Sequence, residues 1–291
     1  MFYSFQGEAL YAGKPSAWIR FFGCNLECNG FGQADPTNPE TYVLPYQTFD
    51  LSAIKRVEDL PVWHHGCDSS YSWSAKYKHL VNDYDEKQVA DKLIEMNVHS
   101  TNPEGKWVHP YTKTDTQLCF TGGEPMMWQK AMVAIVKELD QRDNKPKLIT
   151  IETNATQKVQ SFMAELVDYS GIDFHFAMSP KLFTVSGEKD AIKPEIIASY
   201  IRLGYTHVVK FVVNGTEACW AEVDKAVADI RQATQIVAPE VQPEFWVMPV
   251  GATKDQQEDQ QVAEISVEAM KRGFNVATRK HCYVFGNVIG K

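Results

Sequence analysis

The sequence of 291 residues has no uninterrupted apolar run of the roughly 18 residues that a membrane-spanning helix requires. It also lacks an excess of basic residues: 37 acidic residues outnumber 29 lysines and arginines, and the net charge is −8. A protein that holds nucleic acid on a broad basic surface is therefore not expected. The first residues lack the basic and apolar regions of a secretion signal. These absences predict a cytoplasmic protein that binds neither a membrane nor a nucleic acid.

Cysteine is scarce, and its use is informative. In a reducing compartment the six cysteines of a chain this long are not expected to form a disulfide framework. Three of them have apolar neighbours and are expected to be small core residues, namely Cys119, Cys219 and Cys282. The remaining three are left for chemistry, namely Cys24, Cys28 and Cys67.

The first two of these cysteines form part of a metal-binding motif. Cys24 and Cys28 directly follow an apolar run, so they can bind one face of a metal centre. A cubane iron–sulfur cluster with one open iron needs a third thiolate close by. A compact Cys-x3-Cys-x2-Cys motif would place that thiolate at position 31, which is Phe31. The candidate third ligand is Cys67, which lies much further along the chain.

Short apolar runs alternate with amphipathic stretches of helical period along the chain. The apolar runs predict strands at 17–22, 117–120, 148–152, 173–178, 207–213 and 245–250. The amphipathic stretches predict helices at 85–98, 126–140, 155–169, 194–203, 217–234 and 255–272. Strands that alternate with helices favour parallel βαβ units. The expected fold is therefore α/β: a partial, open TIM-like (β/α)6 barrel in one domain over residues 1–291.

Two polar segments interrupt this alternation. Residues 29–66 and 99–116 contain several prolines and little periodicity. Structureless segments of such length inside a compact domain are usually functional or signs of a wrong assignment. We interpret both as insertions, and the first would lie inside the cluster-binding loop if Cys67 is the third ligand.

Polar and glycine-rich segments follow the predicted strands, at the end where the loops of an α/β barrel converge. The Gly122-Gly123-Glu124-Pro125 segment could expose its backbone to a ligand and offer a carboxylate to an ammonium group. It could equally be a tight turn with Glu124 at a helix N-terminus. Glu152 and Asn154 could bind a ribose or an amino-acid group, or they could end a strand and cap the next helix.

Arg20 is a charged residue inside an apolar strand. It could form a bidentate pair with a substrate carboxylate, or it could form an internal salt bridge. Further polar candidates lie near the two ends of the chain, namely Gln6, Glu8 and His281.

Taken together, these residues resemble the radical S-adenosylmethionine superfamily and, within it, the 7-carboxy-7-deazaguanine synthases. The matching segments span nearly the whole chain, at 4–8, 13–15, 19–20, 23–28, 67–71, 121–125, 152–154, 179–181, 210–211, 248–249, 281 and 285–287. The combination is far more specific than any single segment. The chain departs from the family pattern in the 29–66 insertion, in Ser69 where threonine is usual, and in Ala9 where glycine is expected.

The resemblance implies a set of cofactors and ligands. It implies a [4Fe–4S] cluster on Cys24, Cys28 and Cys67, with S-adenosylmethionine on the open iron. It implies a cofactor site formed by Gly122, Gly123, Glu124, Glu152, Asn154, Ser179 and Lys181. It implies substrate binding by Gln6, Glu8, Arg20 and His281, of which the last three would also be catalytic. It further implies Mg²⁺ on the Ser69 hydroxyl, a flavodoxin-like electron donor and a homodimer.

The implied reaction is a ring contraction. Reductive cleavage of S-adenosylmethionine would start hydrogen abstraction from 6-carboxy-5,6,7,8-tetrahydropterin, and loss of ammonia would give 7-carboxy-7-deazaguanine for queuosine and related 7-deazaguanines. In such enzymes the cluster and cofactor carry the difficult chemistry, and the protein orients the substrate and excludes water.

Two alternatives remain open at this point. Another radical S-adenosylmethionine enzyme, such as a glycyl-radical activase or one acting on a different pterin or purine, would use the same cysteines. An activase would need an open groove for a partner loop, whereas a pterin pocket needs Glu8, Arg20 and His281 to converge. A non-enzymatic zinc protein could instead use the three cysteines with His64 or His65. That alternative leaves the Gly-Gly-Glu-Pro and Glu-Thr-Asn loops unexplained.

Overall fold

The structure is a computed structural model that describes residues 1–286 and 288–290. Asn287, part of the last matching segment, lies outside the described residues. Within these residues one sheet of eight strands follows the order of the chain from β1 to β8. The strands are β1 (Phe2–Phe5), β2 (Pro15–Phe21), β3 (Gln117–Gly122), β4 (Leu148–Thr153), β5 (Asp173–Met178), β6 (Thr206–Val213), β7 (Phe245–Pro249) and β8 (Asn275–Val276).

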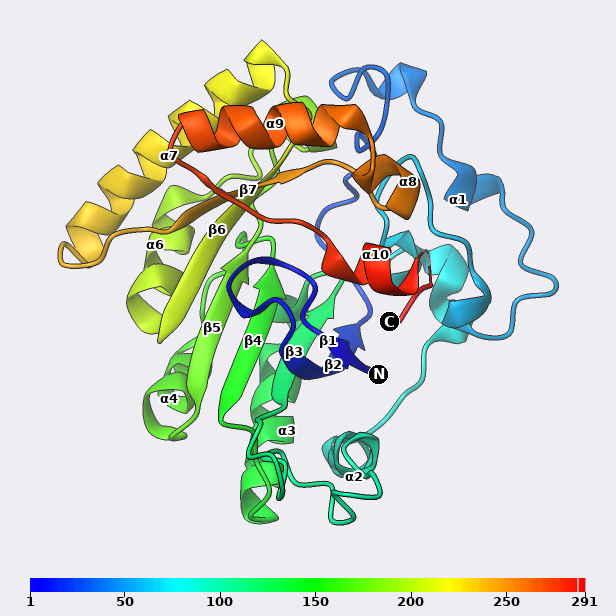
Figure 1. Cartoon of the computed structure of the whole chain (residues 1–291), viewed down its shortest axis with the longest axis vertical. Helices are drawn as coiled ribbons and strands as arrows, with labels where there is room; N and C mark the ends of the chain where they lie inside the picture. Colours follow the sequence, from blue (N-terminus) through cyan, green and yellow to red (C-terminus); the bar gives the residue numbers. More distant parts are fainter. Residues whose placement is uncertain (287, 291) are drawn as a thin grey trace.

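The sheet is an open, partial barrel, as expected. β1 pairs with β2 in the antiparallel sense, and every later neighbour pair from β2 to β8 is parallel. The α-helices are α1 (Pro45–Thr48), α2 (Glu86–Met96), α3 (Gln129–Gln141), α4 (Ser161–Tyr169), α5 (Phe183–Ser186), α6 (Pro194–Leu203), α7 (Glu217–Val237), α8 (Lys254–Gln257), α9 (Gln260–Lys271) and α10 (Lys280–Phe285). Figure 1 shows the sheet curving and the two termini close together beside α10.

The six predicted strands correspond to β2–β7, so the α/β prediction is confirmed. The two strands that were not predicted, β1 and β8, are short, and both lie at the edges of the sheet. A segment of two to four residues has too few positions to show a period of two. No helix in the described part of the chain is long and apolar enough to span a membrane.

Two helix predictions differ from the structure. The predicted helix 155–169 begins only at Ser161, because the preceding loop bonds elsewhere: the backbone N–H of Gln160 donates to Gln129 Oε1 at 2.8 Å. Asn154 is therefore not the cap of that helix. The predicted helix 255–272 is divided into α8 and α9, because the Asp259 side chain accepts from the backbone N–H of Gln261 at 2.8 Å and starts a new helix.

The 29–66 insertion leaves the barrel and returns to it at the same place. The backbone N–H of Gly66 donates to Phe31 O at 2.7 Å, and His65 Nδ1 lies 2.7 Å from Gly32 O. We call residues 29–33 and 64–66, which lie side by side, the stem. The stem closes the insertion at its base, so the long segment between Cys28 and Cys67 does not force these residues apart.

Beyond the stem, the insertion has its own small apolar core. Its buried members come from the insertion, from residues 71–77 and from the C-terminal end, namely Tyr46, Leu60, Trp63, Tyr71, Tyr77 and Ile289. Polar contacts join the same segments, since Tyr77 Oη donates to Tyr46 O at 2.7 Å and Lys76 Nζ donates to Phe49 O at 2.6 Å. The segment is therefore a packed lobe with short helical turns.

The 99–116 segment is held against the main core by one tryptophan. Trp107 is only 1% exposed, lies in the main apolar cluster, and donates from Nε1 to Asn144 O at 3.1 Å. Asn102 supports the turn, because its side chain donates to Asn97 O and Lys106 O, both at 2.9 Å.

We expect Trp107→Ala to lower the free energy of unfolding by about 3–5 kcal/mol, because it removes a large buried side chain and leaves a cavity. Denaturant titration followed by circular dichroism measures this change. Tyr111→Ala is the matched control, because Tyr111 belongs to the same segment and is 84% exposed. Equal effects of the two substitutions would contradict the assignment of Trp107 as the anchor.

Candidate functional site

One cavity of about 310 Å³ gathers nearly all of the predicted site residues. It lies among the loops that follow the carboxyl ends of the parallel strands, where the active sites of α/β barrels are built. The predicted residues that line it are Gln6, Glu8, Arg20, Cys24, Cys28, Cys67, Ser69, Gly122, Gly123, Glu152, Asn154, Ser179, Lys181 and His281. Glu124 is predicted as well but is not among the lining residues.

The insertion supplies part of the cavity wall. Its contribution comes from the stem and the residues next to it, namely Phe31, Gly32, Trp63, His64 and Gly66. Phe31, which occupies the position of the missing third cysteine, lies 5.8 Å from the Lys181 ammonium, measured to the ring centroid. The stem therefore brings Cys67 to the cavity and also encloses one side of it.

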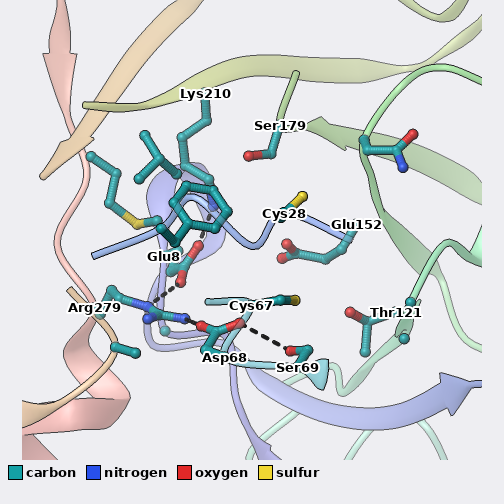
Figure 2. A pocket seen from close by; sticks show the side chains of 18 of the residues that line it. Glu8, Cys28, Cys67, Asp68, Ser69, Thr121, Glu152, Ser179, Lys210 and Arg279 are labelled. Atoms are coloured by element: carbon teal, nitrogen blue, oxygen red, sulfur yellow. Dashed lines mark hydrogen bonds and ion pairs between the residues drawn. The ribbon is translucent and has the colours of Figure 1, made fainter. Parts of the chain in front are cut away.

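All three candidate cluster cysteines face this cavity. Burial raises the pKa of the Cys24 and Cys28 thiols, and it raises the pKa of Cys67 to about 12. The charge of Lys181 acts in the opposite direction on all three thiols. Figure 2 shows the side chains of Cys28 and Cys67 in the same cavity. Three thiols that line one cavity could bind a metal centre, which would replace their protons.

Cys28 is held in place by a carboxylate from the loop after α5. Glu188 Oε1 accepts from the backbone N–H groups of Glu27 at 2.8 Å and Cys28 at 2.5 Å. Cys28 itself has a φ of 52°, a left-handed conformation that non-glycine residues seldom adopt. The bonds from Glu188 therefore stabilise a strained turn that points this thiol into the cavity.

These residues fit a cubane cluster better than a single ion. No group of three or more His, Cys, Asp or Glu side chains in residues 1–286 and 288–290 is arranged to hold one metal ion. A cubane cluster makes a different demand, because each thiolate binds a different iron and the sulfur atoms need not converge on a point.

The glycines of the Gly122-Gly123-Glu124-Pro125 segment allow two loops to approach closely. A Cβ atom on Gly122 would lie 2.2 Å from Phe21 O, and one on Gly123 would lie 2.2 Å from Gly23 O. Glu124 is fully buried, with Oε1 accepting from Thr153 Oγ1 at 2.6 Å and Oε2 accepting from the Asn154 backbone N–H at 2.7 Å. In this arrangement Glu124 joins the loops after β3 and β4, while the two glycines line the cavity.

The other predicted cofactor residues contact a predicted substrate residue, one another and one of the cysteines. Gln6 Nε2 donates to Glu152 Oε1 at 2.9 Å, so a predicted substrate residue contacts a predicted cofactor residue. Lys181 Nζ donates to Ser179 Oγ at 3.2 Å. Asn154 Nδ2 lies 3.9 Å from Cys24 Sγ. The loops after β4 and β5 therefore border the cysteines directly.

A chain of four charged side chains crosses the cavity, and we call it the ionic chain. Lys210 Nζ donates to Glu8 Oε2, and Arg279 Nε donates to Glu8 Oε1 at 3.0 Å. Arg279 Nη2 then donates to Asp68 Oδ2 at 2.7 Å. Figure 2 shows Glu8 between the two cations and Arg279 between the two carboxylates. The ionic chain joins the N-terminal loop, the loop that carries Cys67, β6 and the segment before α10.

The ionic chain fixes the charge states of its members. Burial alone would raise the pKa of Glu8, but the positive charges of Lys210 and Arg279 outweigh it and hold that pKa well below the usual range. Against the effect of burial, Glu8 raises the pKa of Lys210, and Asp68 and Glu8 raise the pKa of Arg279. Burial and the charge of Arg279 lower the pKa of His281 to about 4, so this imidazole is neutral at pH 7.

The Ser69 hydroxyl lies between two charged side chains. Arg20 Nη1 donates to Ser69 Oγ at 3.2 Å, and Ser69 Oγ donates to Asp68 Oδ1 at 3.1 Å. The guanidinium also lies 5.3 Å from the centroid of the Tyr71 ring.

The sequence did not assign roles to several residues of the site. Asp68 and Lys210 fall inside the matching segments 67–71 and 210–211, and Arg279 falls in none of them. One signal was available for Lys210, because it is a lone charge inside the apolar strand β6, as Arg20 is in β2.

Comparison with known proteins gives distant relatives. No protein-family model matches the chain. A 7-carboxy-7-deazaguanine synthase from Buchnera aphidicola subsp. Schizaphis graminum is 23% identical over 210 residues, which cover 68% of this chain and 66% of the relative. A protein of the same name from Thermoplasma acidophilum is 24% identical over 163 residues, which cover 56% of this chain and 48% of the relative. One from Bacteroides thetaiotaomicron is 55% identical over 29 residues, 10% of this chain and 16% of the relative.

We expect Glu8→Gln to lower the free energy of unfolding at pH 7 by about 3 kcal/mol, because it leaves two buried cations without their shared anion. The folded pKa of Glu8 lies below its ordinary value of 4.5, so its stabilising effect is present above that pH and is lost as the pH falls. Urea titrations from about pH 7 to pH 4 measure both effects.

In these titrations the wild-type protein should lose more stability on acidification than the Glu8→Gln variant. The exposed Glu240 provides the control Glu240→Gln, which should follow the wild type. The assignment is wrong if Glu8→Gln and the wild type lose stability in parallel as the pH falls.

Proposed function

We propose that this chain, a distant relative of the 7-carboxy-7-deazaguanine synthases, is a radical S-adenosylmethionine lyase. Its reaction would convert 6-carboxy-5,6,7,8-tetrahydropterin to 7-carboxy-7-deazaguanine with loss of ammonia. The matched part of the chain spans less than two-thirds of the length of either of the first two relatives. The proposed activity is therefore supported by the residues of the site as well as by the similarity to these relatives.

One observation carries the proposal. Three buried or half-buried thiols and three buried or half-buried cations line the same cavity, although they come from segments that are far apart in the sequence. A structural metal site would need the thiols but would not need Arg20 beside them, whereas Lys210 and Arg279 are already paired with Glu8 and Asp68. A site for an anionic substrate next to a cluster needs both the thiols and such a cation.

Each end of the cavity would have its own task. Cys24, Cys28 and Cys67 would hold the cluster, and the loops after β3, β4 and β5 would hold S-adenosylmethionine. When bound, the cluster and S-adenosylmethionine supply the radical chemistry that starts the reaction. The chain itself binds and orients the substrate, and the stem and Trp63 exclude water from one side of the cavity.

The substrate end would recognise a carboxylate and a pterin ring. Arg20 presents a guanidinium that is held by Ser69 and stacked on Tyr71, which suits a carboxylate. His281 is neutral at pH 7, so it can donate from one ring nitrogen and accept at the other. Glu8 has both oxygens engaged by Lys210 and Arg279, so its role would be to orient these cations.

The resemblance also leads us to propose a one-electron donor of the flavodoxin type, a homodimer, and a cytoplasmic location. It also leads us to propose Mg²⁺ on the Ser69 hydroxyl, an oxygen ligand of the kind that Mg²⁺ accepts.

Anaerobic reconstitution tests the proposed function. Iron and sulfide are added to the purified chain, followed by S-adenosylmethionine, a reductant and 6-carboxy-5,6,7,8-tetrahydropterin, with and without Mg²⁺. Mass spectrometry of the products should show 7-carboxy-7-deazaguanine. Formation of 5′-deoxyadenosine without a deazaguanine would favour a different substrate, and failure to assemble a cluster would exclude both radical functions.

We expect Cys67→Ala to abolish cluster assembly as completely as Cys24→Ala, because each removes one of three thiolate ligands. Iron and sulfide content and visible absorbance after reconstitution measure the loss. Cys119→Ala is the matched control, because Cys119 is fully buried in β3 and does not line the cavity. A Cys67→Ala protein that retained a full cluster would show that the third ligand is another residue.

A further inference from the structure

Three indole N–H groups around the cavity have no hydrogen-bond partner. They belong to Trp18, Trp63 and Trp73, and in each the Nε1 atom is buried without a partner among the described residues. A buried donor without an acceptor is destabilising, so native proteins seldom leave one unless it serves a ligand or another function. All three tryptophans line the cavity that holds the cysteines, so each of their N–H groups is a candidate donor to a group bound there.

Trp73 is fixed relative to Cys67 by a short run of turns. The backbone N–H of Ser70 donates to Cys67 O at 3.1 Å, and that of Trp73 donates to Ser70 O at 3.2 Å. The backbone N–H of Gly23 donates to Ser72 O at 2.7 Å, which joins this run to the loop that carries Cys24. Trp73 therefore lies between the loops that supply the first and third cysteines.

The indole ring of Trp73 is also held by packing. It makes an edge contact with the Tyr46 ring, with centroids 5.7 Å apart and planes at 70°. Trp73 lines the same cavity as Cys24, Cys28 and Cys67. Its buried N–H has no partner among the described residues, and of the three unpartnered indoles it is the one that belongs to the run of turns starting at Cys67.

We propose that Trp73 is a positioning residue for the cluster, whose indole N–H donates a hydrogen bond to the Cys67 thiolate or to an adjacent cluster sulfide. The inference rests on the proposed cluster. Hydrogen bonds to the sulfur atoms are one of the factors that set cluster potentials. When one electron from an external donor enters the cluster, the sulfur atoms become more negative, and the N–H stabilises this reduced form more than the oxidised one.

Trp73→Phe should therefore make the cluster harder to reduce. We expect the reduction equilibrium constant to fall roughly tenfold, which lowers the midpoint potential by about 59 mV for a one-electron couple. Anaerobic potentiometric titration of the reconstituted protein, followed by electron paramagnetic resonance, measures the potential. Iron and sulfide content per chain is measured first. A wild-type chain that assembles no cluster overturns both this inference and the proposed function.

Trp128→Phe is the matched control. The Trp128 indole donates to Phe22 O at 2.9 Å, next to the loop that carries Cys24, but it does not line the cavity. This variant should keep the wild-type potential. If the cluster assembles and the Trp73→Phe potential equals that of the wild type, the inference is wrong while the proposed function stands.

A second measurement decides the matter even if Trp73→Phe fails to assemble a cluster. The wild-type protein is labelled with ¹⁵N in its tryptophan indoles, and pulsed electron paramagnetic resonance of the reduced cluster should show a ¹⁵N coupling. The coupling should persist in Trp18→Phe and Trp63→Phe, which remove the other two unpartnered donors. No coupling in the wild type, or its loss in either of these variants, would overturn the inference.

Discussion

An open barrel has two free edges, and its mouth stays in one shape only if something joins the segments around it. In this protein the connection is made by the ionic chain of Lys210, Glu8, Arg279 and Asp68. Glu8 bonds to Lys210, 202 residues away, and to Arg279, 271 residues away, and Arg279 continues to Asp68 beside the third cysteine. A buried charge without a partner is strongly destabilising. Separating these segments would leave such charges unpaired, and this cost holds the segments together. The loop that carries Cys67, the N-terminal loop, β6 and the segment before α10 are joined by it.

Much of the fold could be predicted from the sequence, because strands of a parallel sheet are buried on both faces and appear as continuous apolar runs. The strand 173–178 and the helix 194–203 have the predicted bounds. Short edge strands lack enough positions to show a pattern. Local caps also defeat periodicity: the amphipathic pattern continues through 255–272, yet the Asp259 side chain bonds to the backbone and divides the helix.

The site was predictable to the extent that its residues occur in compact motifs. The cysteines and the loops after the strands could be found in this way, whereas Asp68, Lys210 and Arg279 could not be given roles. Each is a single charged residue whose meaning depends on a partner far away in the sequence. Glu124 shows a different limit: its motif left open a ligand contact or a turn at a helix N-terminus, and its two oxygens are bonded to protein groups, including the backbone N–H of Met126 in the helical turn that follows. A motif identifies a loop more reliably than it identifies what each side chain in that loop touches.

The stem has a consequence for how such chains vary. The entropic cost of closing a loop grows only with the logarithm of its length, about 0.6 kcal/mol for each doubling. A hydrogen bond between Gly66 and Phe31 at the base therefore lets the excursion beyond it lengthen or shorten while Cys28 and Cys67 keep their places. The number of residues between Cys28 and Cys67 therefore does not determine how far apart the two residues lie in the fold. A cluster motif defined by counting residues describes only those chains in which the excursion is absent.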